Sequence, residues 1–435
     1  MKGGKGTFFV PELMKKLLTL SIALLLTFVM AGSVMAQTEI EVWFHSGRGS
    51  EREVIRDQAQ RFTEMDNGIT VNLVKLPEGS YTQQVQSAAA AGDLPDVLDL
   101  DGPTIANYAW SGFLKPLGEF VPEEMEEDFL PSILDQGYYN GKLYALGTFD
   151  SGLAFWGNKE YLEEVNARIP DGVDDAWTFQ EFMDITRRLQ KLPEVEYALD
   201  MKLNYGVNEH YTYEFSPFLQ AFGGDLIDRE TMVAEGTING PEANALASWF
   251  QSLFEKGYVD ANPPGDTQFI EGKTALAWVG HWTYNQHKNA LGDDAILIPA
   301  PKFMGGKQST GMGSWAWSMP ASTEHPEAAW EFMKFILQPE EIIKMTNANG
   351  AVPSRESAIE MSDLYKEGGE LNLFVEQLQK IAVSRPVTPA YPTITSAFQT
   401  AMDNIINGAD VSQELNNAAE TIDEEIEYMG LNQDE

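Results

Sequence analysis

The 435-residue sequence contains no cysteine. This absence excludes disulfides, thiolate metal sites, a cysteine nucleophile and lipid attachment through an N-terminal cysteine. Basic residues are also scarce, because 29 Lys and Arg stand against 66 Asp and Glu, for a formal net charge of -37. Such a surface repels phosphate backbones and anionic lipid head groups at long range, so we expect no nucleic-acid partner and no binding to a membrane surface.

Motifs for nucleotides and metals are missing as well. The sequence has no Walker-type phosphate loop, no G-x-G-x-x-G after a predicted strand, no H-E-x-x-H and no G-x-S-x-G. The five histidines are scattered, and His281 and His287 are poorly spaced for one face of a helix. We therefore predict no cofactor, no metal site and no serine-hydrolase elbow.

One apolar run stands near the N-terminus. Lys15 and Lys16 precede apolar residues 17–30, and small residues follow up to Ala36. A basic start, a short apolar stretch and a small-residue exit predict a secretory signal peptide over residues 1–36, with Met14 as a possible true start. A membrane anchor is the alternative interpretation. No later segment is apolar over the length that a bilayer-spanning helix needs, so we expect a soluble exported chain.

The chain after residue 36 begins with alternating strand and helix patterns. Apolar and polar residues alternate over 39–44 and 70–76, which is typical of strands, and residues 96–100 (DVLDL) are predicted to form a third strand. Helical apolar spacing lies between these segments. This order predicts an α/β domain with a largely parallel sheet. Ligands of such sheets bind beyond the carboxyl ends of the strands, where this chain carries His45 and Ser46 and, after the third strand, residues 99–102.

Aromatic residues gather in glycine-flanked segments rather than on helical faces. The sharpest clusters are residues 280–284, with Trp282, and residues 311–317, with Trp315. Flat aromatic faces cover the C–H patches of a sugar ring, while neighbouring polar groups bind its hydroxyls. The alternative is that these rings are core, which we expect for Trp249 and Trp330 because they lie on helical faces.

Acidic clusters leave a catalytic alternative open. Aspartates crowd residues 93–101 and again 225–228. A glycoside hydrolase needs two carboxylates that face each other across the scissile bond, about 5–9 Å apart, and spacing along a strand does not show this. Solvated edges and hydrogen bonds to a ligand are the other interpretations.

Segments in a fixed order resemble the extracellular solute-binding proteins of family 1, the sugar receptors of ABC importers related to maltose- and trehalose-binding proteins. The segments are residues 42–46 (VWFHS), 91–97 (AGDLPDV), 153–159 (LAFWGNK), 177–182 (WTFQEF), 222–225 (FGGD), 269–275 with 280–282, 327–335 (EAAWEFMKF), 350–355 (GAVPSR) and 385–391 (RPVTPAY). The sequence departs from the family pattern at Gly157 and at the paired Trp315 and Trp317, which affects ligand identity rather than family.

The resemblance implies a two-lobed periplasmic-binding-protein fold, in which each lobe is a mainly parallel sheet flanked by helices and the ligand lies in the cleft at the hinge. Residues 37–147 and 300–350 would form lobe 1, and residues 148–299 and 351–435 would form lobe 2. Chain crossings are expected near 145–149, 299–302 and 351–355. Carried over position by position, the ligand-binding residues would be His45, Ser46, Tyr81, Asp101, Trp156, Asp225, Trp282, Gly313, Trp315 and Arg355.

The function implied by the resemblance is capture of a sugar or oligosaccharide by lobe closure, followed by delivery to the membrane permease of an ABC importer. A monomeric, soluble periplasmic protein without catalytic residues is expected. A glycerol-3-phosphate or phosphodiester receptor of the same family is one alternative. A secreted glycoside hydrolase and a surface adhesin are alternatives of other classes.

Overall fold

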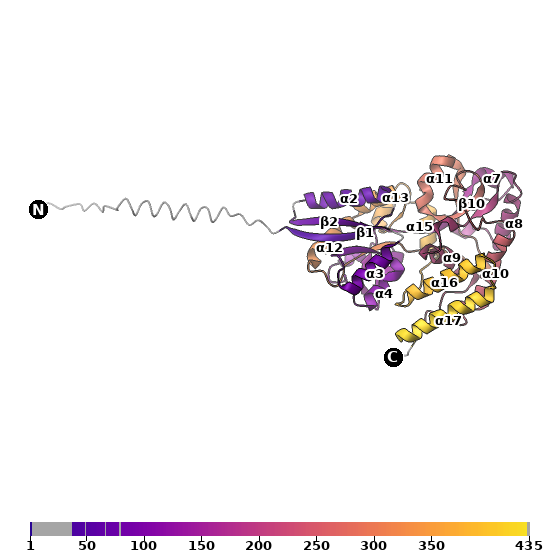
Figure 1. Ribbon diagram of the computed structural model, residues 1–435. Helices are drawn as coiled ribbons and strands as arrows, with labels where there is room; N and C mark the ends of the chain where they lie inside the picture. The colour runs from indigo at the N-terminus through magenta and orange to yellow at the C-terminus, as the bar shows by residue number, and fades with distance from the viewer. Residues whose placement is uncertain (2–36, 48, 66, 78–79, 433–435) are drawn as a thin grey trace.

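The computed structural model describes residues 37–432 apart from 48, 66 and 78–79, together with Met1 (Figure 1). Apart from Met1, the predicted signal peptide lies outside these residues. Two sheets organise the described chain, one in each of two lobes. Within the described ranges, no helix has the length and apolar character that crossing a bilayer requires.

The first sheet has the strand order β2-β1-β3-β13-β6. Its strands are β1 (Thr38–His45), β2 (Ile69–Leu76), β3 (Val97–Asp101), β6 (Ala145–Leu146) and β13 (Trp315–Ser318). β1 runs parallel to β2 and β3, whereas β13 runs antiparallel to β3 and β6. Ile40, Val42 and Phe44 of β1 are buried, as their period-2 spacing predicts for the inward face of a strand.

Helices pack around this sheet and short elements extend its rim (Figure 1). The helices are α2 (Gly49–Glu64), α3 (Tyr81–Ala91), α4 (Ile105–Trp110), α5 (Glu123–Glu126), α6 (Pro131–Gly137), α12 (Pro326–Ile336) and α13 (Pro339–Asn349). The short strands β4 (Tyr138–Tyr139) and β5 (Lys142–Leu143) form a hairpin beside them.

The second sheet has the order β11-β8-β10-β9. Its strands are β8 (Leu153–Asn158), β9 (Tyr197–Asp200), β10 (Thr274–Gly280) and β11 (Ala295–Ile298). The sheet is mixed rather than mainly parallel, because β8 runs antiparallel to both β10 and β11 and only β9 is parallel to β10. The two-lobed α/β fold is confirmed. The second sheet differs from the expectation, which was a mainly parallel sheet in each lobe.

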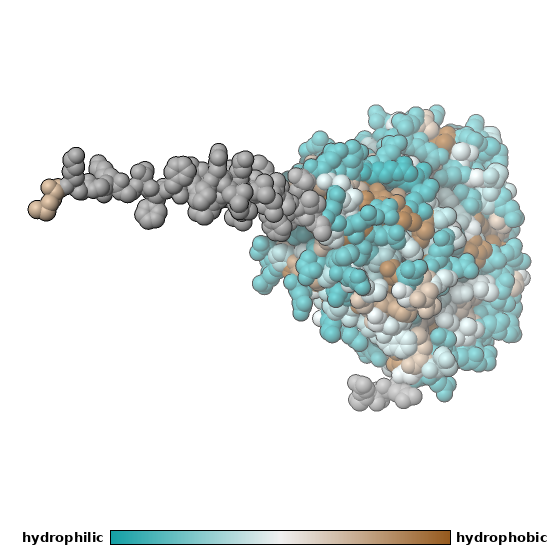
Figure 2. All heavy atoms as spheres, turned by 60° about the vertical axis from the view of Figure 1, so that its left-hand side comes forward, coloured by the Kyte–Doolittle hydropathy of each residue, from teal (hydrophilic) through white to brown (hydrophobic). Residues whose placement is uncertain are grey.

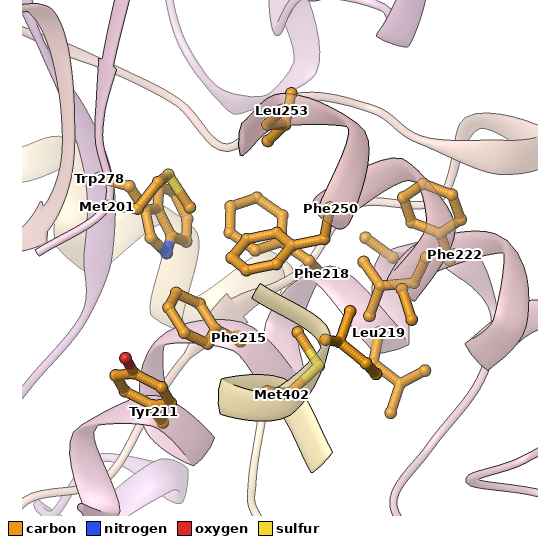
Figure 3. Close-up of a cluster of buried hydrophobic side chains, with 14 of the residues drawn as sticks. Met201, Tyr211, Phe215, Phe218, Leu219, Phe222, Phe250, Leu253, Trp278 and Met402 are labelled. Atoms are coloured by element: carbon orange, nitrogen blue, oxygen red, sulfur yellow. The ribbon is translucent and has the colours of Figure 1, made fainter. Parts of the chain in front are cut away.

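The helices of the second lobe bury a large aromatic core. They are α7 (Lys159–Glu164), α8 (Phe179–Leu189), α9 (Glu209–Phe222), α10 (Pro241–Glu255), α11 (Tyr284–Leu291), α16 (Tyr391–Ile406) and α17 (Val411–Met429). Figure 3 shows Phe215 and Phe218 of α9 close to Phe250 of α10 and Trp278 of β10. Phe222, at the end of α9, packs instead against Trp249 and Phe303. Nearly all of α9 from Tyr211 to Phe222 is buried, so this packing holds the helix and its first turn in place.

Short strands join the two lobes. β7 (Phe149–Asp150) pairs with β14 (Val352–Pro353), and β12 (Thr310–Gly311) pairs with β15 (Ala382–Val383). Two further helices, α14 (Glu356–Met361) and α15 (Asn372–Lys380), follow β14 along the chain.

The contacts near the chain crossings favour lobe boundaries that differ from those expected from the family resemblance. Lys302 bridges to Thr178, and Phe303 packs in the aromatic core of the second lobe, so we propose that the second crossing lies at residues 312–314. α14 contacts α13 and β14, so we propose that residues 351–361 belong with the first lobe.

Figure 2 shows one face that is largely hydrophilic, with apolar residues in small separate patches. This distribution agrees with the strong excess of acidic residues in the sequence.

Candidate ligand-binding cleft

A cavity of about 920 Å³ lies where the two lobes meet. From the first lobe it is lined by His45, Gly47, Glu51, Ser80, Thr82, Gln83, Gln86, Asp101, Gly313, Ser314, Trp315 and Asn349. From the second lobe and the crossing segments it is lined by Phe149, Ser151, Tyr205, Asn208, Glu209, His210, Tyr213, His281, Trp282 and Arg385. Its volume falls within the range of about 300–1,000 Å³ that is typical of small-molecule sites.

Strand ends build the first-lobe wall. His45 is the last residue of β1, Asp101 is the last of the neighbouring parallel strand β3, and Trp315 opens β13 directly opposite Asp101. Because the carboxyl ends of adjacent parallel strands meet at one edge of a sheet, these three side chains converge there.

Asp99 orients the side chain of His45. Its Oδ2 lies 2.6 Å from Nδ1 of His45, and its Oδ1 accepts a hydrogen bond from the His45 backbone N–H at 3.1 Å. Tyr81 donates its hydroxyl to the Asp99 carbonyl at 2.6 Å and meets the Trp315 ring edge-on at a centroid distance of 5.2 Å. Burial raises the pKa of Tyr81 well above its usual value. Tyr81 does not line the cavity but supports the residues that do.

The first turn of α9 builds part of the second-lobe wall. Asn208 caps the helix by accepting a hydrogen bond from the His210 backbone N–H at 2.9 Å. This cap starts the helix so that Glu209, His210 and Tyr213, within one turn of each other, all reach the cavity.

Trp282 enters the cavity directly after β10. The preceding Gly280 is required there, because a Cβ on it would lie 2.0 Å from the Trp282 ring. The indole N–H donates to the Tyr205 hydroxyl at 3.2 Å, and Tyr205 in turn contacts Asp266. This chain of contacts holds the indole at the cavity wall.

Arg385 connects the lobes across the cavity. Its Nη1 lies 2.5 Å from Oε1 of Glu209 in the second lobe, and its Nη2 lies 3.5 Å from Oδ1 of Asp101 in the first. The guanidinium also lies over the Tyr213 ring, 5.1 Å from its centroid. Burial alone would lower the pKa of Arg385, but Tyr391, Asp101 and Glu209 raise it above its ordinary value. The arginine is therefore a permanent cation whose charge is already matched by carboxylates.

The structure brings together part of the set predicted from the sequence. The predicted residues that line the cavity are His45, Asp101, Trp282, Gly313 and Trp315. Ser46 lies between the lining residues His45 and Gly47, and its carbonyl accepts a hydrogen bond from Arg52. That these predicted residues contact a ligand stays a prediction.

Three other predicted residues, Trp156, Asp225 and Arg355, do not line this cavity, and we propose to leave them out of the candidate site. Asp225 pairs with Arg229 at 2.7 Å. Arg355 binds Asp128 at 2.7 Å, and its Nη1 donates to the Leu337 carbonyl at 2.9 Å, which anchors it within the first lobe.

Trp156 is also removed, because it lies at a second cavity of about 550 Å³. That cavity is lined by α11, β11 and the loop before α15, and Trp156 there meets His287 edge-on at 4.9 Å. Residues of the first sheet do not line it, so ligand contacts at this cavity would not bring the two sheets together.

Much of the second-lobe wall was not predicted from the sequence. Two features of the sequence could have pointed to these residues. Arg385 lies in a segment that carries the family resemblance, and Glu209 and His210 stand beside two tyrosines at the start of a helix. Across the part of the chain that the structure describes, no three His, Asp or Glu side chains group as metal ligands would.

Comparisons with known proteins agree with this architecture. The sequence profile described as "Bacterial extracellular solute-binding protein" matches residues 48–342. A maltotriose-binding protein of Pyrococcus abyssi is 23% identical over 384 residues, covering 85% of this chain and 77% of its own length.

Solved structures share the fold. The GacH receptor of Streptomyces glaucescens, solved unliganded and with acarbose, matches with a TM-score of 0.76 at 21% identity, covering 90% of this chain and 99% of that one. The sugar-binding protein MalE of Xanthomonas citri matches with a TM-score of 0.77 at 18% identity, covering 92% and 100%.

Proposed function

We propose that this chain, which belongs to the family of bacterial extracellular solute-binding proteins, captures an uncharged sugar or oligosaccharide for an ABC importer. The ligand would bind in the interlobe cavity and leave it chemically unchanged. The role of substrate-binding receptor is supported by relatives whose names describe binding of maltotriose, mannitol and arabinooligosaccharide.

One observation carries the proposal: Trp315 and Trp282 reach the same cavity from opposite lobes. Each indole offers an apolar face, and both are set among hydrogen-bonding groups such as Gln83, Asn208 and Asn349. A sugar ring presents C–H patches on its faces and hydroxyls around its edge. The cavity matches both features, with aromatic rings for the faces and amides and carboxylates for the hydroxyls.

The charges at the cavity favour a neutral ligand over a phosphate ester. Among the described residues that line it, Arg385 is the sole Lys or Arg, and Glu209 and Asp101 already neutralise it. Glu51 adds a further carboxylate. A phosphate would need an uncommitted cation or a cluster of backbone N–H donors, so this arrangement argues against the glycerol-3-phosphate alternative.

The carboxylates also argue against glycoside hydrolysis. A hydrolase keeps one carboxyl protonated as a general acid and a second one facing it across the scissile bond. Here Asp101 and Glu209 both pair with Arg385, so each carboxyl group is already engaged with the same guanidinium. We therefore assign them to hydrogen bonding with ligand hydroxyls.

Closure of the lobes would provide the signal to the transporter. Because ligand contacts come from both lobes, a bound sugar stabilises the conformation in which the two walls are close. We propose that this closed form of a monomeric, periplasmic protein is what the membrane permease recognises.

A thermal-shift screen of the exported protein tests the proposal. The panel would hold mono-, di- and trisaccharides, polyols and glycerol phosphates, with chromatography of each sugar after incubation. We expect a raised melting temperature with at least one uncharged saccharide and no shortened product. Stabilisation by phosphate esters alone would favour the phosphate receptor, and new reducing ends would favour the hydrolase. Small-angle X-ray scattering with the stabilising sugar would separate a closing receptor from an adhesin whose shape does not change.

A further inference from the structure

Lys202 is buried in the second lobe, in a backbone conformation that few lysines adopt. Its φ and ψ are 49° and 32°, in the left-handed region that residues other than glycine rarely occupy. Its side chain has no contact with solvent. A left-handed backbone and a buried charge both cost free energy, which the contacts of the ammonium group must offset.

Two carboxyl groups match this ammonium group. Nζ of Lys202 lies 2.8 Å from Oδ2 of Asp200 and donates to Oδ1 of Asp266 at 2.9 Å. Burial alone would lower the pKa of Lys202, but Asp200 and Asp266 raise it above its ordinary value. Lys202 therefore stays a cation, and it holds Asp266 from a position that does not line the cavity.

Asp266 has a second donor, the hydroxyl of Tyr205. The Tyr205 oxygen lies 3.2 and 3.3 Å from the two carboxyl oxygens of Asp266, and 3.2 Å from Nε1 of Trp282. An indole N–H donates and cannot accept, so the Tyr205 oxygen is the acceptor toward Trp282. Its own proton then serves Asp266. The direction of each hydrogen bond between Lys202 and Trp282 is thereby fixed.

Trp282 is held at two opposite edges of its indole. At the benzene edge the ring lies against Gly280, where a Cβ would come within 2.6 Å of three ring atoms. At the pyrrole edge the N–H is held by the Tyr205 hydroxyl. Two anchors on opposite edges fix both side-chain torsions of a planar ring. The protein therefore sets the angle at which this indole stands in the cavity wall.

We propose that Asp266, held in place by Lys202, is a positioning residue for ligand binding. It takes the proton of the Tyr205 hydroxyl, which leaves the Tyr205 oxygen as the acceptor that orients the Trp282 ring toward the ligand. The ligand rests on the function proposed above, whereas the orientation of the ring does not. Contact with the C–H face of a sugar depends on the angle of the aromatic ring, so a turned indole binds more weakly.

Proton–nitrogen NMR of tryptophan-labelled protein without ligand tests the orientation of the ring. Asp266→Leu removes the acceptor of the Tyr205 proton. We expect the indole N–H signal of Trp282, assigned with Trp282→Phe, to shift and to exchange with solvent about fivefold faster, as for the loss of one hydrogen bond. Trp177, whose indole donates to the Arg168 carbonyl, is the internal reference. An unchanged Trp282 signal would overturn the proposal whether or not a sugar has been found.

A conservative variant tests whether the hydrogen bonds carry the effect. Lys202 and Tyr205 share Oδ1 of Asp266, so the amide oxygen of Asp266→Asn can still accept from both. We expect this variant to keep the Trp282 signal and to bind any sugar found in the screen within about threefold of the parent Kd. Asp266→Leu should raise that Kd about tenfold. Equal losses of affinity in the two variants would contradict the proposal.

Asp128→Leu is the matched control for lost stability. Asp128 is 21% exposed, against 27% for Asp266, and it likewise accepts from one cation and one hydroxyl, those of Arg355 and Ser357. It does not line the cavity. We expect a similar loss of stability in urea with an unchanged Kd. An equal rise of Kd in Asp128→Leu would show that lost stability weakens binding, which would count against a positioning role for Asp266.

If Asp266→Leu does not fold, Tyr205→Phe supplies the same readout, because it removes the hydroxyl that joins Asp266 to Trp282. We expect the Trp282 indole signal to shift in this variant and to stay in place in Asp266→Asn. A Trp282 signal that is the same in Tyr205→Phe as in the parent would refute the proposal.

Discussion

The imidazole of His45 lies flat against the indole of Trp315, with ring centroids 3.8 Å apart and planes 9° from parallel. Asp99 holds the imidazole through Nδ1, and Tyr81 meets the indole edge-on. The aromatic wall is therefore fixed by the protein itself before any ligand is present. A rigid wall of this kind reduces the entropy that ligand binding would otherwise lose.

Loss of either cavity tryptophan should weaken sugar binding. We expect Trp315→Ala and Trp282→Ala each to raise Kd at least about tenfold, because a lost stacking or apolar contact is worth roughly 1–3 kcal/mol. Titration calorimetry gives the comparison. Trp110→Ala is the control, since Trp110 is exposed on α4 and does not line the cavity. Unchanged affinity in both cavity variants would remove these rings from the site.

Trp156→Phe should leave sugar affinity unchanged within about twofold, because Trp156 lines the smaller cavity beside His287. The family resemblance alone predicts the opposite result. Calorimetry beside the parent protein and Trp282→Ala decides between the two. A tenfold loss of affinity in Trp156→Phe would show that the smaller cavity, or the strand that carries Trp156, takes part in binding.

Arg385→Gln should strongly destabilise the protein, because it leaves Asp101 and Glu209 without their shared cation. Breaking a buried ion pair on one side costs about 3–5 kcal/mol of unfolding free energy. Urea denaturation measures the change. Arg229→Gln is the control, because its pair with Asp225 is partly exposed and should cost below about 1 kcal/mol. Equal losses in the two variants would contradict the role of Arg385 as the link between the lobes.

His287 should make the protein less stable as the pH falls below neutrality. Burial lowers the pKa of His287 to about 3, whereas in the unfolded chain its pKa is about 6.5. Between these values the unfolded state binds a proton that the folded state does not, so its contribution to stability decreases as the pH falls.

Replacement of His287 by Phe should remove about 2 kcal/mol from the loss of unfolding free energy between pH 7 and pH 5. Urea titrations at the two pH values give this difference. His325→Gln, at an exposed position, should leave it as in the parent. An unaltered pH dependence in His287→Phe would show that His287 takes up a proton over the same pH range in the folded and the unfolded protein.

The first half of the fold could be predicted from local patterns. Alternation in β1 and β2 and the helical spacing of α2 are strong signals, and right-handed crossovers then require parallel neighbours. The direction of β8 could not be predicted in this way, because a fully buried strand has the same pattern whether its neighbours are parallel or antiparallel.

The residues of the candidate site could likewise be predicted only in part. His45 and Asp101 could be predicted because they end adjacent strands of one sheet. Arg385 could not, because its place depends on how the segment after β15 passes between the lobes, and no local pattern encodes that path. The pairing of Arg355 with Asp128 could not be predicted either, since the two residues are distant in sequence.

Native mass spectrometry of the protein after incubation with a defined mixture of uncharged saccharides and phosphate esters tests the central claim most directly. We expect one chain carrying one intact, uncharged saccharide, and loss of that adduct in Trp315→Ala. A chain that carries only phosphate esters, or saccharides released shorter than they were supplied, would contradict it.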